Sequence, residues 1–229
     1  IKAKKLKYKK FDGVDDLTKY AAKVIVDSNV VGWYQGRSEW GSRALGNRSI
    51  LANPANKNMK DIINSKIKKR ESFRPFAPSV LREDITEWFE LDYDSPYMLL
   101  VGKVKKSKRI KMTAKEESLF GINKLNIKRS SIPAVTHVDY SSRIQTVYKE
   151  TNPKYHKLIT KFKEKTGCPV IVNTSFNVRG EPIVNTPTDA FNCFMGTELD
   201  YLIIGNCILD KEKQNPNLKK DYTKEFELD

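Results

Sequence analysis

Apolar residues recur at helical spacing in several stretches of the chain. Between residues 15 and 29, Leu17, Ala21, Val24 and Ile25 fall on one face, and an acidic pair precedes them at the expected helix start. The stretch 153–166 stops at a glycine, the residue that most readily adopts the left-handed conformation found at helix ends. The pattern predicts helices over residues 15–29, 56–70, 85–91, 153–166 and 186–196.

Short apolar runs bounded by turn residues separate these helices and predict strands. They occupy residues 30–34, 97–101, 143–148, 169–173, 201–204 and 207–209. Residues 73–81 contain two prolines, which lack an N–H donor, and we expect them to form an edge strand. Because strands and helices alternate throughout, the predicted fold class is α/β. No convincing linker interrupts the pattern, so we expect one compact domain.

The expected domain covers residues 15–210, between a basic N-terminal segment at 1–14 and a polar tail at 211–229 that we expect to be frayed. Residues 103–131 combine weak periodicity with heavy charge, which indicates a partly irregular insertion. The chain starts at Ile1 without a methionine, so we expect it to be a piece of a longer protein.

The net charge of +14 first suggests a nucleic-acid partner, but its distribution argues against one. Residues 1–10 contribute +6 and residues 103–129 contribute +8, leaving 26 basic and 26 acidic residues elsewhere. The body of the fold is therefore neutral, and we interpret the two basic runs as solvated surface. No apolar run approaches the roughly 18 residues of a membrane span. Three widely spaced cysteines fit neither a disulfide framework nor a zinc site, which predicts a reducing, cytoplasmic location.

The window Gly36–Ile50 holds three glycines and three arginines. Glycine lets backbone N–H groups approach a ligand, and arginine offers a planar fork that suits phosphate and carboxylate. The bland alternative is a strand-to-helix turn with surface arginines. Clustering of Arg37, Arg43 and Arg48 among glycines favours an anion site instead, with Glu39 pairing with one arginine to hold the others in place. The order of residues is not that of a Walker loop.

Two further segments carry groups suited to anions. Lys68 ends a predicted helix and Arg74 begins the next strand, so both side chains can reach one anion. The lysine ammonium is a point charge on a flexible stem, and the arginine guanidinium fixes the orientation of the anion. Ser175 and Asn177 directly follow a predicted buried strand, where α/β sheets place ligands. The alternatives are a helix-end charge for Lys68 and a hydrogen-bonded turn for the Ser–Asn pair.

Histidine chemistry is sparse in this sequence. His137 and Asp139 could join Ser175 in a triad, but no nucleophile elbow is present, and we interpret His137 as structural or substrate-contacting. Only two histidines exist, which excludes a His-rich metal site within this chain; Mg²⁺ carried by a nucleotide remains compatible with it.

Four blocks together resemble the C-terminal domain of the nodulation-type and antibiotic O-carbamoyltransferases. They are Gly-Arg-x-Glu-x-Gly-x-Arg-Ala-Leu-Gly-x-Arg-Ser-Ile (36–50), Arg-Glu-x-Phe-Arg-Pro-Phe-Ala-Pro (70–78), Arg-x-Gln-Thr-Val (143–147) and Asn-Thr-Ser-Phe-Asn-x-x-Gly-Glu-Pro (173–182). Ser42 stands where the family usually has proline. The resemblance implies a twisted, largely mixed sheet flanked by helices, similar to the domain that makes threonylcarbamoyl-adenylate.

The resemblance also implies an activity. A domain of this kind uses ATP, with Mg²⁺, and carbamoyl phosphate to form carbamoyl-adenylate. A separate N-terminal transferase domain, which holds iron or another metal, then passes the carbamoyl group to a hydroxyl acceptor; we expect this chain to be the activating part without that domain. By motif, Lys68, Arg74 and Arg143 should hold the phosphates and the carbamoyl group. Arg43, Ser175 and Asn177 should bind substrate or nucleotide, with Arg37 and Glu39 as secondary candidates.

Two other functions stay open at this stage. A basic nucleic-acid-binding module without catalysis would use residues 1–10 or 103–129 rather than the arginine window. A degenerate domain that only stabilises its partner would bind no nucleotide. The hydroxyl acceptor and the oligomeric state have no signature in this sequence.

Overall fold

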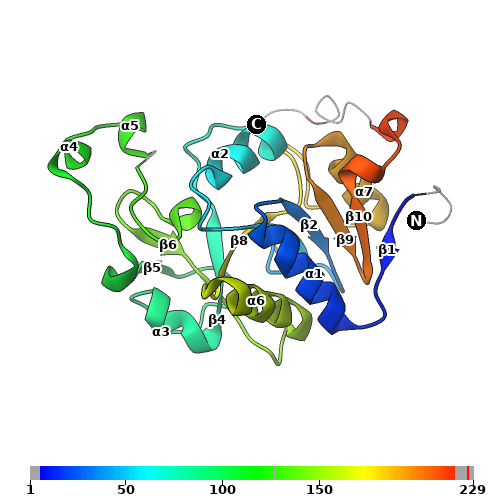
Figure 1. Ribbon diagram of the computed structural model, residues 1–229, viewed down its shortest axis with the longest axis horizontal. Helices are drawn as coiled ribbons and strands as arrows, with labels where there is room; N and C mark the ends of the chain where they lie inside the picture. Colours follow the sequence, from blue (N-terminus) through cyan, green and yellow to red (C-terminus); the bar gives the residue numbers. More distant parts are fainter. Residues whose placement is uncertain (1–5, 126, 220–225, 227–229) are drawn as a thin grey trace.

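The computed structural model describes residues 6–125, 127–219 and 226 of the chain. Within them, eight strands form one mixed sheet in the order β1-β10-β9-β2-β3-β8-β4-β7, while β5 and β6 pair separately (Figure 1). β2 runs parallel to β9, and β4 to β7; the other pairs of the large sheet are antiparallel. The strands are β1 (Lys9–Lys10), β2 (Val31–Tyr34), β3 (Arg48–Ala52), β4 (Ala77–Leu81), β5 (Val101–Lys103), β6 (Ser141–Arg143), β7 (Gln145–Val147), β8 (Val170–Ser175), β9 (Tyr201–Ile204) and β10 (Cys207–Asp210).

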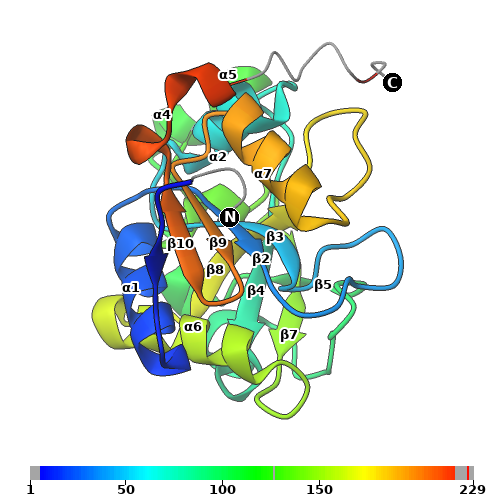
Figure 2. The ribbon, with the colours of Figure 1, turned by 90° about the vertical axis from the view of Figure 1, so that its right-hand side faces the viewer.

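Helices cover both faces of the large sheet, which confirms the predicted α/β class. The α-helices are α1 (Val14–Val26), α2 (Met59–Ile62), α3 (Ile85–Trp88), α4 (Ala114–Glu117), α5 (Ile122–Leu125), α6 (Pro153–Thr166) and α7 (Pro187–Gly196). α1 and α6 pack side by side on one face (Figure 1), and α7 lies on the other (Figure 2). Their apolar stripes, such as Leu17 and Ile25 on α1 and Phe162 on α6, are fully buried in one continuous core.

The structure adds a strand that the sequence pattern did not indicate. β3 begins at Arg48, inside the glycine and arginine window, and pairs with β2 on one side and β8 on the other. All five of its residues are buried, including Arg48 and Ser49. Because the first two residues of β3 are polar, only three apolar residues remain in this strand, and so short an apolar run does not by itself predict a strand.

The expectation that residues 73–81 form an edge strand is wrong. β4 lies inside the sheet between β8 and β7. Pairing with β7 begins only at Ser79, one residue beyond Pro78, so the missing N–H of that proline costs this pairing no hydrogen bond. The prolines shorten the strand at its N-terminal end without excluding it from the interior.

Two other predicted strands change in the structure. Residues 95–98 form a turn in which the Met98 N–H donates to the Ser95 carbonyl. The Leu100 N–H donates to the Ser95 hydroxyl, and the strand starts only at Val101. The stretch 143–148 breaks at Ile144: β6 pairs with β5 in the small sheet, whereas β7 joins the large one. This corner places Arg143 at the junction of the two sheets.

The predicted helix 56–70 is shorter and changes its winding. α2 passes at Ile63 into a π-helical turn that ends at Lys68, and Lys69 follows in the left-handed conformation. Wider π turns inside α-helices are frequent at functional sites.

The chain ends also depart from expectation. β1 adds Lys9 and Lys10 of the basic segment to the sheet edge beside β10. The first residues of the polar tail are not frayed, because Gln214 is buried and its side-chain amide donates to the carbonyls of Lys7 and Asp210 at 2.8 Å each. The charged insertion carries only short helices, and α4 and α5 extend away from the large sheet (Figure 1). No helix among the described residues is long and apolar enough to cross a membrane.

Candidate functional site: an arginine pocket at one end of the sheet

Four chain segments meet at one end of the large sheet. Because β8 runs antiparallel to β3 and β4, its C-terminal residue Ser175 lies at the level where β3 and β4 begin. β7 runs parallel to β4, so its start, next to Arg143, lies at the same end. The loop before β3, the loop before β4, the corner before β7 and the end of β8 therefore surround one space.

A small cavity of about 130 Å³ occupies this space. Three guanidinium groups line it, from Arg43, Arg70 and Arg143, together with the Ser175 end of β8. The remaining lining residues are Ser42, Ala44, Pro75, Phe76, Ala77, Met98, Asn173 and Thr174. No carboxylate is among them, so the lining carries three positive charges and no negative one, although Glu71, outside the lining, acts on Arg70. Such an arrangement favours an anion with several oxygens.

Burial and mutual repulsion tune the arginines. Burial, with a smaller effect of the Arg43 charge, lowers the pKa of Arg143, and its Nε atom is buried without a hydrogen-bond partner in the described structure. Burial and then Arg74 lower the pKa of Arg70, whose Nε donates to Asn64 Oδ1 at 2.7 Å. Because a guanidinium stays charged even when burial lowers its pKa, these arginines keep N–H groups that can donate hydrogen bonds to a ligand.

Lys68 lies directly behind this pocket. Its side chain is 3% exposed, and its ammonium nitrogen has four oxygen neighbours. These are Ser175 O at 2.5 Å, Ser175 Oγ at 3.1 Å, Asn177 Oδ1 at 2.6 Å and Asn177 O at 3.0 Å. Since an ammonium group only donates, Ser175 Oγ accepts from Lys68 and turns its own proton to Asn177 Oδ1, 2.7 Å away. Lys68, Ser175 and Asn177, all predicted as site residues, thus form one hydrogen-bond network in which Lys68 donates to both partners and Ser175 donates to Asn177.

The buried position of Lys68 predicts a pH-dependent stability. Burial, reinforced by the charge of Arg70, lowers the pKa of Lys68 to about 7, below its value in an unfolded chain. Between these values the unfolded state binds more protons, so the burial penalty is released as pH rises. We expect the unfolding free energy of the wild type to rise relative to Lys68→Met by up to about 1.4 kcal/mol per pH unit between about pH 7 and 10. Urea unfolding across this range measures it; a pH-independent difference would contradict it.

Glu39 stabilises the loop of the arginine window through hydrogen bonds to its backbone. Glu39 Oε1 accepts the backbone N–H groups of Leu45, Asn47 and Arg48 at 2.8, 2.7 and 3.2 Å. It does not pair with a guanidinium in the described structure, contrary to expectation, and occupies the backbone donors that the glycines were expected to offer a ligand. Arg48 points inward, donates to the carbonyls of Gln35 and Gly36, and stacks on Tyr34. Of the three arginines in the window, Arg43 lines the pocket.

A buried amide network ties the same loop to the sheet. Asn173 Nδ2 donates to Ala44 O at 3.0 Å and to Gln145 Oε1 at 2.8 Å, and Gln145 Nε2 donates to Leu45 O at 2.8 Å. Both side chains are almost completely buried. Sequence reasoning did not single out either residue; the signal was their position inside the quoted blocks, beside Arg143 and Ser175.

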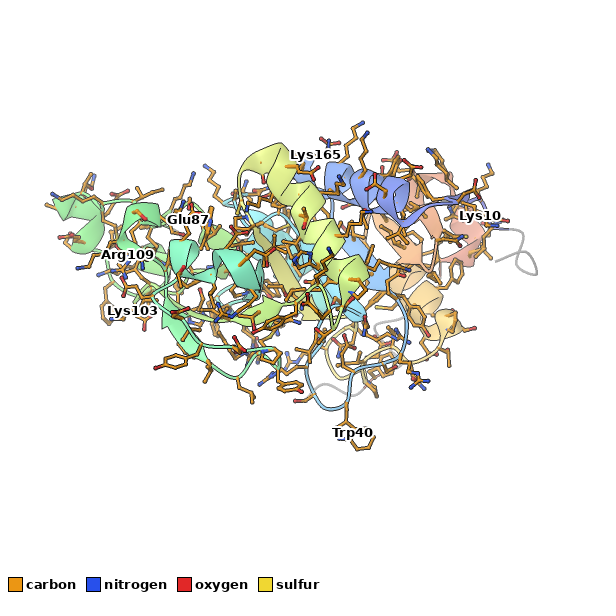
Figure 3. All side chains as sticks on the ribbon, turned by 90° about the horizontal axis from the view of Figure 1, so that it is seen from below. Lys10, Trp40, Glu87, Lys103, Arg109 and Lys165 are labelled. Carbon is orange, nitrogen blue, oxygen red and sulfur yellow. The ribbon has the colours of Figure 1, made fainter. Side chains whose placement is uncertain are left out.

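The remaining predicted residues lie outside the cavity lining. Arg74 is half exposed and its Nε lies 3.0 Å from Glu71 Oε2, whereas Arg70, which was not selected, takes the place at the pocket. Arg37 is exposed on the same loop as Trp40, which projects from the molecule (Figure 3). His137 is half-buried, and burial lowers its pKa. It lies in neither a triad nor a metal cluster within the described residues.

A larger cavity of about 600 Å³ lies at the opposite end of the sheet, near Asp200, Asp210 and Lys211. Its acidic and basic side chains are mixed, and Lys211 there donates to the carbonyls of Phe194 and Thr197 at the end of α7. The larger volume favours this cavity as a binding site, but the charges favour the arginine pocket, because of the two cavities only the arginine pocket is lined by charged side chains of a single sign.

Known proteins resemble the chain over most of its length. Residues 22–211 match the family described as "Carbamoyltransferase C-terminus". The chain is 56% identical over 217 residues to the uncharacterized protein sll1178 of Synechocystis, covering 94% of this chain and 35% of that protein. It is 45% identical to the nodulation protein NolNO of Sinorhizobium fredii, covering 88% and 27% of the two chains. It is 39% identical to a 3'-hydroxymethylcephem-O-carbamoyltransferase of Amycolatopsis lactamdurans, covering 80% and 31%.

Among solved structures, full-length HypF in its phosphate- and nucleotide-bound form aligns with 91% of this chain and 22% of its own, with a TM-score of 0.47 and 16% identity. The chain spans about a third or less of the length of the curated relatives it matches. With the family match covering every strand of the large sheet except β1, together with α6, α7 and every segment that lines the arginine pocket, the chain belongs to the carbamoyltransferase C-terminal domain family.

Proposed function

We propose that this domain activates a carbamoyl group with ATP. Carbamoyl phosphate and water give carbamate and inorganic phosphate. A carbamate oxygen then attacks the α-phosphorus of ATP, the bond between the α-phosphorus and the bridging oxygen breaks, and pyrophosphate leaves, so that carbamoyl-adenylate remains. In the longer protein, an N-terminal metal-binding domain would transfer the carbamoyl group to a hydroxyl acceptor.

The observation that supports this proposal is the convergence of Arg43, Arg70 and Arg143 on a pocket without carboxylates. Joining carbamate to ATP brings two anions together and develops further negative charge on the departing pyrophosphate. Fixed cations lower that repulsion and hold the reactants in line, and no protein nucleophile is required. The described pocket offers hydrogen-bond donors, and the Ser175 hydroxyl in it donates its proton to Asn177 Oδ1 and not to Lys68, which fits positioning of substrates better than nucleophilic attack by the protein.

Magnesium would enter with the nucleotide rather than through a protein site. The described residues contain no group of three or more His, Cys, Asp or Glu side chains placed to hold a metal ion. The pocket donors suit the oxygens of a phosphate chain and not a bare cation, so Mg²⁺ would stay on the ATP phosphates.

Incorporation of labelled pyrophosphate into ATP tests the proposal. We expect exchange that depends on carbamoyl phosphate, measured on the full chain that carries this domain, and nucleotide binding by calorimetry. Replacing the exposed Lys105, Lys111 and Lys115 of the insertion by glutamine should leave exchange unchanged. Salt-sensitive RNA binding that these replacements abolish, with no exchange in the wild type, would favour the nucleic-acid module instead. Absence of both exchange and nucleotide binding would identify a degenerate domain.

A further inference from the structure

Lys68 carries a buried charge whose hydrogen-bond partners are all neutral. Its four oxygen neighbours belong to the backbone carbonyls, hydroxyl and amide of Ser175 and Asn177. Burying an ion costs several kcal/mol, and neutral dipoles offset only part of that cost. A compensating negative charge nearby would keep Lys68 protonated.

Three ionisable groups act on Lys68 from the elements around it. Arg70, just beyond the π turn, is a cation and opposes protonation. Cys193 faces it from α7, but burial and the nearby Glu181 raise the pKa of that thiol well above its ordinary value, so it is neutral at neutral pH. Glu181, in the turn after β8, is the carboxylate among them, and one peptide unit separates it from Lys68: the carbonyl of Asn177 accepts from Lys68 at 3.0 Å, and the N–H of Val178 donates to Glu181 Oε2 at 2.8 Å.

Glu181 also shapes the turn that holds Asn177. The Val178 N–H donates to Glu181 Oε2 at 2.8 Å, and Asn177 Nδ2 donates to the Glu181 carbonyl at 2.6 Å. The second bond orients the amide so that Asn177 Oδ1 faces Lys68 and Ser175. Glu181 is 7% exposed, which keeps its charge poorly screened by water.

We propose that Glu181 is a positioning residue of this site: its carboxylate is the buried counter-charge of Lys68, and its carbonyl orients Asn177 toward that lysine. The catalytic part of this inference rests on the proposed function; the pairing of the two charges does not. Glu181 acts through Lys68 and Asn177 and contacts no substrate in this scheme.

A double-mutant cycle tests the pairing without any assay of activity. Glu181→Gln keeps the shape and an oxygen acceptor but removes the charge. At pH 5, where Lys68 with its folded-state pKa of about 7 is protonated, we expect it to raise the unfolding equilibrium constant of the wild-type background by up to about 100-fold, because a buried cation loses its counter-charge. In the Lys68→Met background the same change should cost less than about tenfold, since no cation remains to compensate. Equal effects in both backgrounds would overturn the pairing.

Asp84→Asn provides the matched control. Asp84 is a buried carboxylate that binds Lys163 at 2.7 Å, at the far end of β4 from the pocket. Its effect on unfolding should be the same with and without Lys68, because the two sites share no partner. Coupling of Asp84 with Lys68 as large as that of Glu181 would show a general loss of stability and would overturn the specific assignment.

The pH profile of pyrophosphate exchange tests the catalytic part. Loss of the carboxylate lowers the affinity of Lys68 for its proton, so the alkaline fall of the exchange rate should move down by about 1 to 3 pH units in Glu181→Gln. In Asp84→Asn it should overlay the wild type. An unshifted profile in Glu181→Gln would overturn the positioning role. If the wild type shows no exchange, the proposed function fails, while the unfolding cycle still decides on the pairing.

Discussion

Replacing Arg143 by alanine is expected to lower the rate of carbamoyl-phosphate-dependent ATP–pyrophosphate exchange by about 10²–10³-fold. Arg143 stands at the corner between β6 and β7 and lines the pocket with Arg43 and Arg70. Its guanidinium is partly buried, and its nearest hydrogen-bonding neighbour in the described structure is Met98 Sδ at 3.9 Å. No ion pair has to be broken when it binds a substrate, so its removal should affect the reaction more than the fold.

Three comparison variants sharpen this test. Arg143→Lys keeps the charge and loses the fork, and should recover only part of the rate. Arg82→Ala removes an arginine paired with Asp94 at the opposite end of β4 and should leave exchange unchanged. Arg70→Ala should cost more than Arg74→Ala, because the former lines the pocket and the latter pairs with Glu71 at the surface. Unaltered exchange in Arg143→Ala, or a larger loss in Arg74→Ala, would contradict the pocket assignment.

Gly46→Ala is expected to lower the unfolding free energy by about 4 kcal/mol. Gly46 has φ +107°, and a Cβ there would lie 2.2 Å from Cδ1 of the fully buried Tyr155 on α6. Its carbonyl accepts from Trp33 Nε1 and its N–H donates to Ser49 Oγ, so the backbone cannot withdraw without breaking buried hydrogen bonds. Backbone strain and overpacking therefore add. Thermal unfolding should show a drop of roughly 10 °C in Tm.

Gly167→Ala is the control for this substitution. Gly167 ends α6 with φ +72°, and no atom lies within 4 Å of where its Cβ would stand. It carries the conformational strain alone, so we expect a loss of about 1 kcal/mol. Similar losses for both variants would show that the contact with Tyr155 contributes nothing. Gly46→Ala should also reduce exchange, because the loop that carries Arg43 rests on this contact.

The helices were the elements most fully predicted from the pattern of apolar residues. α1, α6 and α7 each bury one stripe against the sheet, and this periodicity survives in any chain that places a helix on a core. The strands were less visible. β3 opens with buried Arg48 and Ser49, whose burial depends on partners far along the chain, and β4 lies in the interior in spite of its prolines. Periodicity contains no information about such partners.

For the site too, the sequence predicted one part and the tertiary structure decided the other. Residue types and their order pointed to an anion pocket built from the window, the Lys68–Arg74 segment, Arg143 and the Ser175 turn, because arginine, glycine and short polar groups have few other common uses in such clusters. Strand pairing decided which side chains share the pocket. Antiparallel β8 brings Ser175 to the starts of β3 and β4, which admits Arg43 and Arg70, turns Arg74 outward and buries Lys68 behind the turn. Local sequence specifies what a side chain can bind, whereas its direction and its burial are set by neighbours that can lie more than a hundred residues away along the chain.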